Sequence, residues 1–165
     1  MGYGEACYRR VRTAALAWDF DHGGGGKKSL GIVSAAAGPR PGGAPRDLAT
    51  FAALPLPRPL PSLFVVNPVR VIYAAKDARA LVPRCLASST AYATRAGHLL
   101  AGEERVTVVW RRRGATGGAV DVEVASFSRA APSRRGRLVW PLIGRMQRRF
   151  FLAEVEHLAA VGRGE

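Results

Sequence analysis

Cysteine, histidine and long apolar runs are all scarce in this chain of 165 residues. Its two cysteines, Cys7 and Cys85, are too few for a disulfide scaffold, and nothing requires an oxidising compartment. No apolar run approaches the ~18–20 residues that a membrane-spanning helix needs. The first ten residues contain no apolar segment of a secretory signal. We therefore expect a protein that stays inside the cell.

Metal-ligand patterns are also missing. His22, His98 and His157 lie far apart, and the two cysteines do not form a Cys-x-x-Cys pair. The short motifs of serine hydrolases, phosphate-binding loops and zinc proteases are absent. We therefore expect neither a metal nor a cofactor.

Acidic residues are few, since 12 Asp and Glu stand against 25 Lys and Arg, for a formal charge of +13. Such an excess first suggests a polyanionic partner, either nucleic acid or an anionic membrane surface. However, only Lys27, Lys28 and Lys76 are lysine, and heavy use of Arg with Ala, Gly and Pro is typical of a GC-rich coding sequence. Much of the charge therefore needs no functional explanation.

One local excess of arginine stands out near the C-terminal end. It is typical of a surface that faces anionic membrane headgroups or phosphates. Few aromatic residues are interleaved with it, which makes nucleic acid the less favoured partner without excluding it. The members of this cluster are Arg129, Arg134, Arg135, Arg137, Arg145, Arg148 and Arg149.

Apolar residues make up 48% of the chain, which is enough for a folded core. The length suits a single domain over residues 1–165. Residues 36–48 and 76–90 are expected to be flexible insertions, and the alternate prolines of 55–61 predict an extended connector.

The apolar pattern predicts helices at both ends and strands between them. In the strand over 103–111, Val106, Val108 and Trp110 should share one face. Asn67-Pro68 predicts a bulge or an edge break, and Pro141 is expected in the first turn of the last helix. The predicted elements are a helix over 5–18, strands over 30–35, 63–75, 103–111 and 119–128, a basic loop over 130–136, and a helix over 138–161.

This order predicts an α+β fold, in which a single curved antiparallel sheet packs on a long C-terminal helix and a short N-terminal helix. A sheet and helix arranged in this way resemble the helix-grip, START-like and Bet v 1-like proteins, with a cavity between helix and sheet. We expect the apolar lining of that cavity to be Val106, Val108, Trp110, Val120, Val122, Leu142, Met146 and Phe150.

Polar residues that could orient a ligand gather over 92–105. His98 could act as an acid or base near neutral pH, whereas Glu103 and Glu104 are adjacent in a strand and must point to opposite faces. A solvated ladder of Glu and Arg, with His98 capping a turn, explains the same pattern without any site. The candidate ligand-binding residues are Tyr92, Thr94, His98, Glu103, Glu104, Trp110, Glu123, Ser128 and Met146; no catalytic residue is assigned.

Several segments resemble an uncharacterised plant and bacterial family, the domain-of-unknown-function nineteen-ninety family. The resemblance is sharpest over Gly97-His98-Leu99-Leu100-Ala101-Gly102-Glu103-Glu104-Arg105, followed by Glu123 to Arg129. Segments 2–8, 15–18, 67–73, Trp140-Pro141 and 147–150 add to it. The chain departs from the family pattern upstream of residue 1, across 76–90 and at Ala130. The resemblance implies no catalytic activity, and for some plant relatives it implies a channel in the plastid outer envelope.

Four hypotheses follow. The first and most favoured is a non-enzymatic domain that binds a lipid or another apolar or amphipathic small molecule between sheet and helix. The second is a plastid outer-envelope channel or membrane-associated protein, and the third is nucleic-acid binding through the arginine cluster. An enzyme that uses His98 with a glutamate is favoured least.

Overall fold

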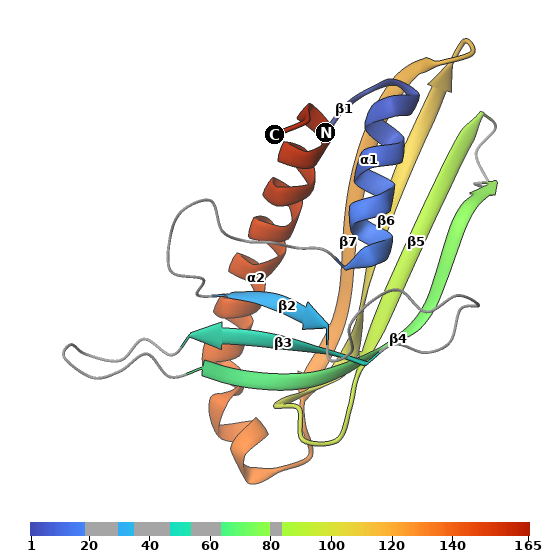
Figure 1. Ribbon diagram of the computed structural model, residues 1–165. Helices are drawn as coiled ribbons and strands as arrows, with labels where there is room; N and C mark the ends of the chain where they lie inside the picture. Colours follow the sequence, from blue (N-terminus) through green and yellow to red (C-terminus); the bar gives the residue numbers. More distant parts are fainter. Residues whose placement is uncertain (19–29, 35–46, 54–63, 80–83) are drawn as a thin grey trace.

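The computed structural model describes residues 1–18, 30–34, 47–53, 64–79 and 84–165 (Figure 1). Two helices accompany one antiparallel sheet, so the fold is α+β. The elements are β1 (Gly2–Tyr3), α1 (Gly4–Ala17), β2 (Leu30–Ser34), β3 (Asp47–Ala53), β4 (Phe64–Arg79), β5 (Cys85–Thr94), β6 (Leu100–Arg113), β7 (Gly117–Ala130) and α2 (Arg134–Arg163).

Seven strands form one curved sheet in the order β1-β7-β6-β5-β4-β3-β2 (Figure 1). Every neighbouring pair is antiparallel. The alternation predicted for β6 is confirmed, because Val106, Val108 and Trp110 are all buried while Arg105 and Arg111 are exposed. We call the face that carries Val106 and Val108 the inner face.

Helix α1 covers the inner face over β5, β6 and β7, and α2 runs beside it (Figure 1). The N- and C-termini therefore lie close together, and the Arg10 guanidinium donates hydrogen bonds to the carbonyls of Val161 and Gly162. The buried apolar cluster joins all these layers. It includes Cys7, Tyr8, Val11, Ala15, Trp18, Leu48, Val69, Tyr92, Val106, Val108, Trp110, Val120, Phe150 and Leu158.

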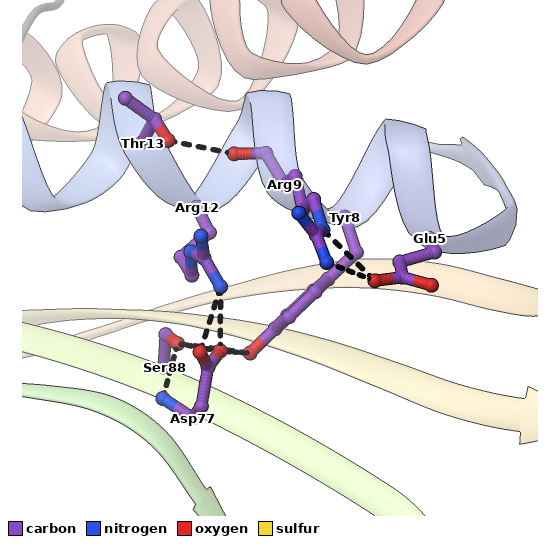
Figure 2. Close-up of polar contacts among 7 residues, drawn as sticks. All are labelled: Glu5, Tyr8, Arg9, Arg12, Thr13, Asp77 and Ser88. Atoms are coloured by element: carbon purple, nitrogen blue, oxygen red, sulfur yellow. Dashed lines mark hydrogen bonds and ion pairs between the residues drawn. The ribbon is translucent and has the colours of Figure 1, made fainter.

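A polar network fixes α1 to the sheet (Figure 2). Asp77 accepts hydrogen bonds from the Tyr8 hydroxyl at 2.9 Å and from Arg12 Nη1 at 2.7 Å and 2.8 Å. Ser88 Oγ accepts from the Asp77 backbone N–H. Burial alone would raise the pKa of Asp77, but the hydrogen bonds from Arg12 and Tyr8 outweigh it and lower the pKa. The Tyr8 ring also stacks on Trp110 at 5.6 Å between centroids, so the same side chain joins apolar and polar contacts.

Helix α2 begins earlier than the pattern predicted. Ser133 Oγ accepts a hydrogen bond from the Gly136 N–H at 3.0 Å, which caps the helix in the middle of the predicted basic loop over 130–136. Pro141 consequently lies inside the helix, and the expected first-turn position is wrong. Its missing N–H leaves the Arg137 carbonyl without the usual helical donor.

The bulge predicted at Asn67-Pro68 is also wrong, because these residues pair in regular register with Thr50 and Ala49. The Pro68 carbonyl accepts from the Arg95 N–H. In a strand, the nitrogen and carbonyl of one residue point to the same side, so the Pro68 nitrogen faces the β5 side where that strand has already ended. A missing donor costs little there.

The actual irregularities of β4 lie further along, between Val71 and Tyr73 and between Ala75 and Ala78. Within 76–90, the segment expected to be a flexible insertion, residues 76–79 belong to β4 and 85–90 to β5. Most of 36–48 and the connector over 55–61 lie outside the described residues.

Candidate functional site

Two glutamates from different layers are buried between the sheet and α2. Glu104 on the inner face of β6 is 2% exposed, and Glu154 on α2 is 0% exposed. Glu104 Oε2 accepts a hydrogen bond from the Tyr92 hydroxyl at 2.6 Å. Within the described part of the chain, Glu104 Oε1 and both oxygens of Glu154 receive no hydrogen bond from an N–H or hydroxyl donor. Buried polar atoms without a donor are rare and costly, so this pair needs a specific explanation.

The two carboxyls influence each other's titration. Burial raises the pKa of Glu104 to about 7, although hydrogen bonds from Tyr92 and from Glu154 oppose this rise by favouring the ionised form. Burial also raises the pKa of Glu154 well above its ordinary value, and the charge of Glu104 raises it further. The pair therefore holds at least one proton at neutral pH. Since Tyr92 stabilises ionised Glu104, we place that proton on Glu154, from which it can be donated to Glu104.

Three aromatic residues lie near the pair, namely Tyr92, Trp18 and Phe150. Trp18, the residue that ends α1, packs against Tyr92 with 5.0 Å between ring centroids, and its Nε1 donates to Thr90 Oγ1 at 2.9 Å. Phe150 is buried one helical turn before Glu154 on the same side of α2. The carboxyls thus lie in a largely apolar setting with an aromatic wall.

A pocket of about 530 Å³ lies at the end of the sheet, formed by residues 94–101 and 131–133. Thr94 follows Tyr92 by two residues on β5, and Gly102 precedes Glu104 by two residues on β6, which is roughly 6.6 Å in each case. Thr94 and Gly102 therefore share the inner face with Tyr92 and Glu104. Thr94 Oγ1 accepts from the Gly102 N–H at 3.0 Å, which holds the two strands together beside the pocket. The inner face therefore continues from the pocket to the carboxyl pair.

His98 lies in the wall of this pocket. Its Nδ1 accepts a hydrogen bond from the Leu100 N–H at 2.9 Å. Burial lowers the pKa of His98 to about 4, so the ring is neutral at physiological pH. A neutral ring with Nδ1 engaged leaves Nε2–H as its free donor, which makes His98 a hydrogen-bonding group rather than a cation.

Serines of β7 connect the sheet to α2 next to the site. Ser128 Oγ donates to Gln147 Oε1 at 3.1 Å, and Gln147 Nε2 donates to Ser126 Oγ at 3.4 Å. Ser126 lies opposite Glu104 in the β6–β7 register, and Ser128 lies opposite Gly102. Gln147 therefore holds α2 against β7 at the same level as the pocket and the carboxyl pair.

The structure brings together only some of the predicted ligand-binding residues. Tyr92, Thr94, His98, Glu104 and Ser128 occur at this end of the inner face, as described above. Glu103 and Glu123 are exposed on the opposite face of the sheet, where Glu123 pairs with Arg105 at 3.4 Å. Glu103 and Glu104 do point to opposite faces, as their adjacency in a strand predicted. The Met146 side chain lies outside the described residues.

Much of the expected cavity lining is filled core instead. Val106, Val108, Trp110 and Val120 are 0–3% exposed and pack in one cluster with Tyr8 and other residues of α1. The expectation of a ligand cavity along this stretch is wrong, because α1 occupies the space over it. Val122 packs at the edge of the cluster and Phe150 within it, and the Leu142 side chain lies outside the described residues.

Two residues of the site were missed from the sequence. Glu154 interrupts the apolar stripe between Phe150 and Leu158, at a spacing of four residues on each side. A charged residue in the middle of a helix's apolar face was the available signal. Trp18 gave no signal of this kind, because its approach to Tyr92 depends on how α1 packs on the sheet.

The arginine cluster borders the pocket. Arg129, Arg134, Arg137, Arg148 and Arg149 are exposed, and none of them forms an ion pair with a described acidic residue. The side chains of Arg135 and Arg145 lie outside the described residues. The periodic apolar residues of the predicted helix over 138–161 begin with Leu138, but this side chain is 83% exposed. The stripe fails there because the first turns of α2 extend past the end of the sheet (Figure 1).

Comparison with known proteins identifies a family. The sequence model of the family described as "Domain of unknown function (DUF1990)" matches residues 1–156, so the chain belongs to that family. No curated protein and no solved structure shows significant similarity to it. Among the described residues, no group of three or more His, Cys, Asp or Glu is placed to hold a metal ion, and neither helix is long and apolar enough to cross a membrane.

Proposed function

We propose that this member of the DUF1990 family is a non-enzymatic domain that binds an apolar or amphipathic small molecule between the inner face of its sheet and α2. The ligand enters through the pocket at residues 94–101 and 131–133. Its polar end is oriented by Tyr92, His98 and the two buried glutamates. The fold is then a helix-grip variant in which α1 fills one half of the inner face and leaves the other half to the ligand.

The observation that supports this proposal best is the pair of buried carboxyls beside the pocket. A domain that only needed a stable core would gain by placing apolar side chains at Glu104 and Glu154, since isolated buried carboxyls oppose folding. Ligand sites commonly combine apolar walls with a few convergent polar groups and perturbed pKa values. All of these features occur together at this end of the inner face.

Native mass spectrometry tests the proposal. The purified chain is incubated with a lipid extract, and we expect a bound mass that is retained in the native state and released on denaturation. The Ala96→Trp variant places a large side chain at the pocket wall and should lose the bound mass. Ala115→Trp adds the same side chain at the exposed β6–β7 turn, at the other end of the sheet, and should keep it. A wild-type spectrum without any retained molecule contradicts the proposal.

A second candidate function, docking on an anionic membrane surface, is supported by Leu138. This apolar side chain is almost fully exposed directly after Arg137 and one helical turn after Arg134, and Pro132 and Ser133 of the pocket lie just before these arginines. An apolar residue flanked by unpaired cations suits the headgroup region of a bilayer. Docking there would bring the pocket opening to the membrane, from which an amphipathic ligand could be taken.

Sedimentation with vesicles of phosphatidylserine and phosphatidylcholine tests docking. Leu138→Ser and the double variant Arg134→Glu/Arg137→Glu should each reduce the bound fraction. Arg84→Glu/Arg113→Glu is the matched control, since it makes the same charge change on exposed residues at the opposite end of the sheet. If the double variant loses binding to RNA while Leu138→Ser does not affect vesicle binding, the arginines serve nucleic acid and the membrane proposal fails.

A further inference from the structure

The carboxyl pair lacks hydrogen-bond donors although the chain is rich in cations. The ion pairs of the described residues use Glu5, Asp47, Asp77, Asp121, Glu123 and Glu165, and none uses Glu104 or Glu154. Among the residues that the structure describes, no N–H or hydroxyl group donates to three of the four carboxyl oxygens of the pair. The proton on Glu154 can serve Glu104, and a ligand can bring donors for the oxygens that are left.

The chemistry of the pair restricts that ligand. An ionised carboxyl accepts hydrogen bonds only, so the pair attracts N–H and O–H donors and repels a carboxylate or phosphate. Two carboxyls together can compensate a positive charge on the ligand. The Tyr92 hydroxyl donates to Glu104, and the Trp18 ring packs against the Tyr92 ring, so two aromatic residues lie near the pair. A protonated amine meets all of these conditions, since it supplies three donors and the missing charge.

We infer that Glu104 and Glu154 bind the ammonium head group of an amphipathic amine, whose apolar part occupies the space towards the pocket. This inference rests on the proposed function and makes it specific. Tyr92 holds Glu104 in place, and Glu154 closes the site from α2. In the absence of the amine, the proton on Glu154 takes the place of the ligand's positive charge.

Binding of the amine must therefore release a proton. The free pair holds at least one proton, whereas the pair that contacts an ammonium group is stable with both carboxyls ionised. The proton passes to the solvent, and no covalent bond is made or broken. Affinity for the amine should consequently rise with pH, most steeply below about pH 7, where the free pair holds the Glu104 proton as well, and less steeply above it, where only the Glu154 proton is left to release.

Matched probes with one chain length and different head groups provide the test. Binding of decylamine, decanol and decanoate is measured by native mass spectrometry and calorimetry below their micelle concentrations. We expect decylamine to bind at least about tenfold more tightly than decanoate, the size of effect that charged hydrogen bonds supply. The net charge of +13 works against this order, because non-specific attraction favours the anionic probe.

Two pairs of variants separate the site from its surroundings. Glu154→Gln and Glu104→Gln should abolish the preference for decylamine. Glu156→Gln and Glu103→Gln change exposed carboxyls on the same two elements and should preserve it. If Glu154→Gln or Glu104→Gln fails to fold, the preference of the wild type for decylamine and the pH dependence of that preference still test the inference.

The outcomes distinguish this inference from the proposal beneath it. If none of the three probes binds, the proposed function itself is contradicted. If decanoate or decanol binds as tightly as decylamine, the binding function survives and the ammonium site is wrong. If Glu154→Gln and Glu104→Gln both retain the preference for decylamine, the assignment of the ammonium site to this pair is also wrong.

Discussion

Tyr92 on β5 and Glu104 on β6 lie directly opposite each other in the antiparallel register, and the Tyr92 hydroxyl donates to Glu104 Oε2 at 2.6 Å. Burial, and then the Glu104 charge, raise the pKa of Tyr92 well above its ordinary value, so the hydroxyl stays a donor. This hydrogen bond stabilises the ionised form of Glu104, and the Tyr92 hydroxyl forms no hydrogen bond with Glu154. This asymmetry makes Glu104 the carboxyl that loses its proton first.

Replacing Tyr92 by Phe should therefore affect both stability and titration. The variant keeps the ring that packs against Trp18 but removes the donor to Glu104. We expect a loss of about 1–3 kcal/mol in the free energy of unfolding, because a buried carboxyl loses its hydrogen bond. The pKa of Glu104 should rise further, which carboxyl infrared bands can follow during a pH titration. A Glu104 titration unchanged from the wild type would contradict the assigned role of Tyr92.

Glu154→Gln should change how stability depends on pH. The folded-state pKa values of both carboxyls are raised above their unfolded value. Such groups stabilise the fold fully below the unfolded pKa, and this stabilisation is lost as the pH rises through the folded pKa. The loss begins near the unfolded pKa of 4.5 and continues to about pH 7 for Glu104, so between about pH 5 and 7 the wild type should lose at least about 2 kcal/mol, since one pKa unit corresponds to ~1.4 kcal/mol. The variant should lose less than half of that.

Chemical denaturation at several pH values provides this measurement. Glu156→Gln alters an exposed carboxyl two residues away on α2 and should follow the wild-type curve. If Glu154→Gln and the wild type have parallel curves over this range, the two carboxyls do not share a proton as described.

Features that depend on local periodicity could be predicted from the sequence, and features that depend on packing between elements could not. The alternation in β6 placed Val106, Val108 and Trp110 on one buried face, because neighbouring side chains of a strand always point to opposite sides. Glu104 followed as an inner-face residue for the same reason. The partner of Glu104 did not follow, since it depends on how α2 is placed along the sheet.

The prediction of a ligand cavity along Val106, Val108 and Trp110 was wrong for a similar reason. The sequence predicted a helix near residues 5–18, and the structure has one at Gly4–Ala17. Its position on the inner face depends on long-range contacts such as those of Tyr8 and Arg12 with Asp77. No pattern within residues 4–17 indicates these partners. Side chains that looked available to a ligand are therefore core residues under α1.

His98→Asn should remove a pH effect on stability that is opposite in sign to the effect of Glu104 and Glu154. Burial lowers the folded-state pKa of His98 to about 4, below its usual 6.5. A neutral buried histidine stabilises the fold above the unfolded pKa, and this contribution is lost as the pH falls from about 6.5 to 4. Asparagine can still accept from the Leu100 N–H in an Asx-turn but does not titrate.

Thermal unfolding at about pH 7 and pH 5 tests this effect. On acidification, the variant should gain about 2–4 °C relative to the wild type, the shift that ~1 kcal/mol produces in a domain of this size. His157→Asn is the control for a second histidine outside the pocket. Equal shifts for both variants would show that the environment of His98 is not responsible.

Tyr8→Phe should weaken the attachment of α1 to the sheet. Tyr8 is 1% exposed, and its hydroxyl contacts both Asp77 and Ser88 at 2.9 Å (Figure 2). The variant retains the stacking on Trp110 but leaves buried polar groups less satisfied, so we expect a loss of about 1–3 kcal/mol. Tyr3→Phe, at a position that is 80% exposed, should have little effect. Similar stability of the two variants in urea would show that the network does not hold α1 in place.

Gly102→Ala should disrupt the β6–β7 pairing beside the pocket. A Cβ at this position would overlap the Phe127 carbonyl oxygen and lie 2.7 Å from the Ser128 Cα. Both are backbone atoms of β7, so the strand itself would have to move, at a cost of about 3 kcal/mol or more. Gly114→Ala is the matched control, because a Cβ there meets nothing within 4 Å and only the positive φ of 69° opposes it. That strain alone should cost about 1–2 kcal/mol. Because Gly102 lies between Thr94 and Ser128, the Gly102→Ala variant should also lose the bound molecule in native mass spectrometry, whereas Gly114→Ala should retain it.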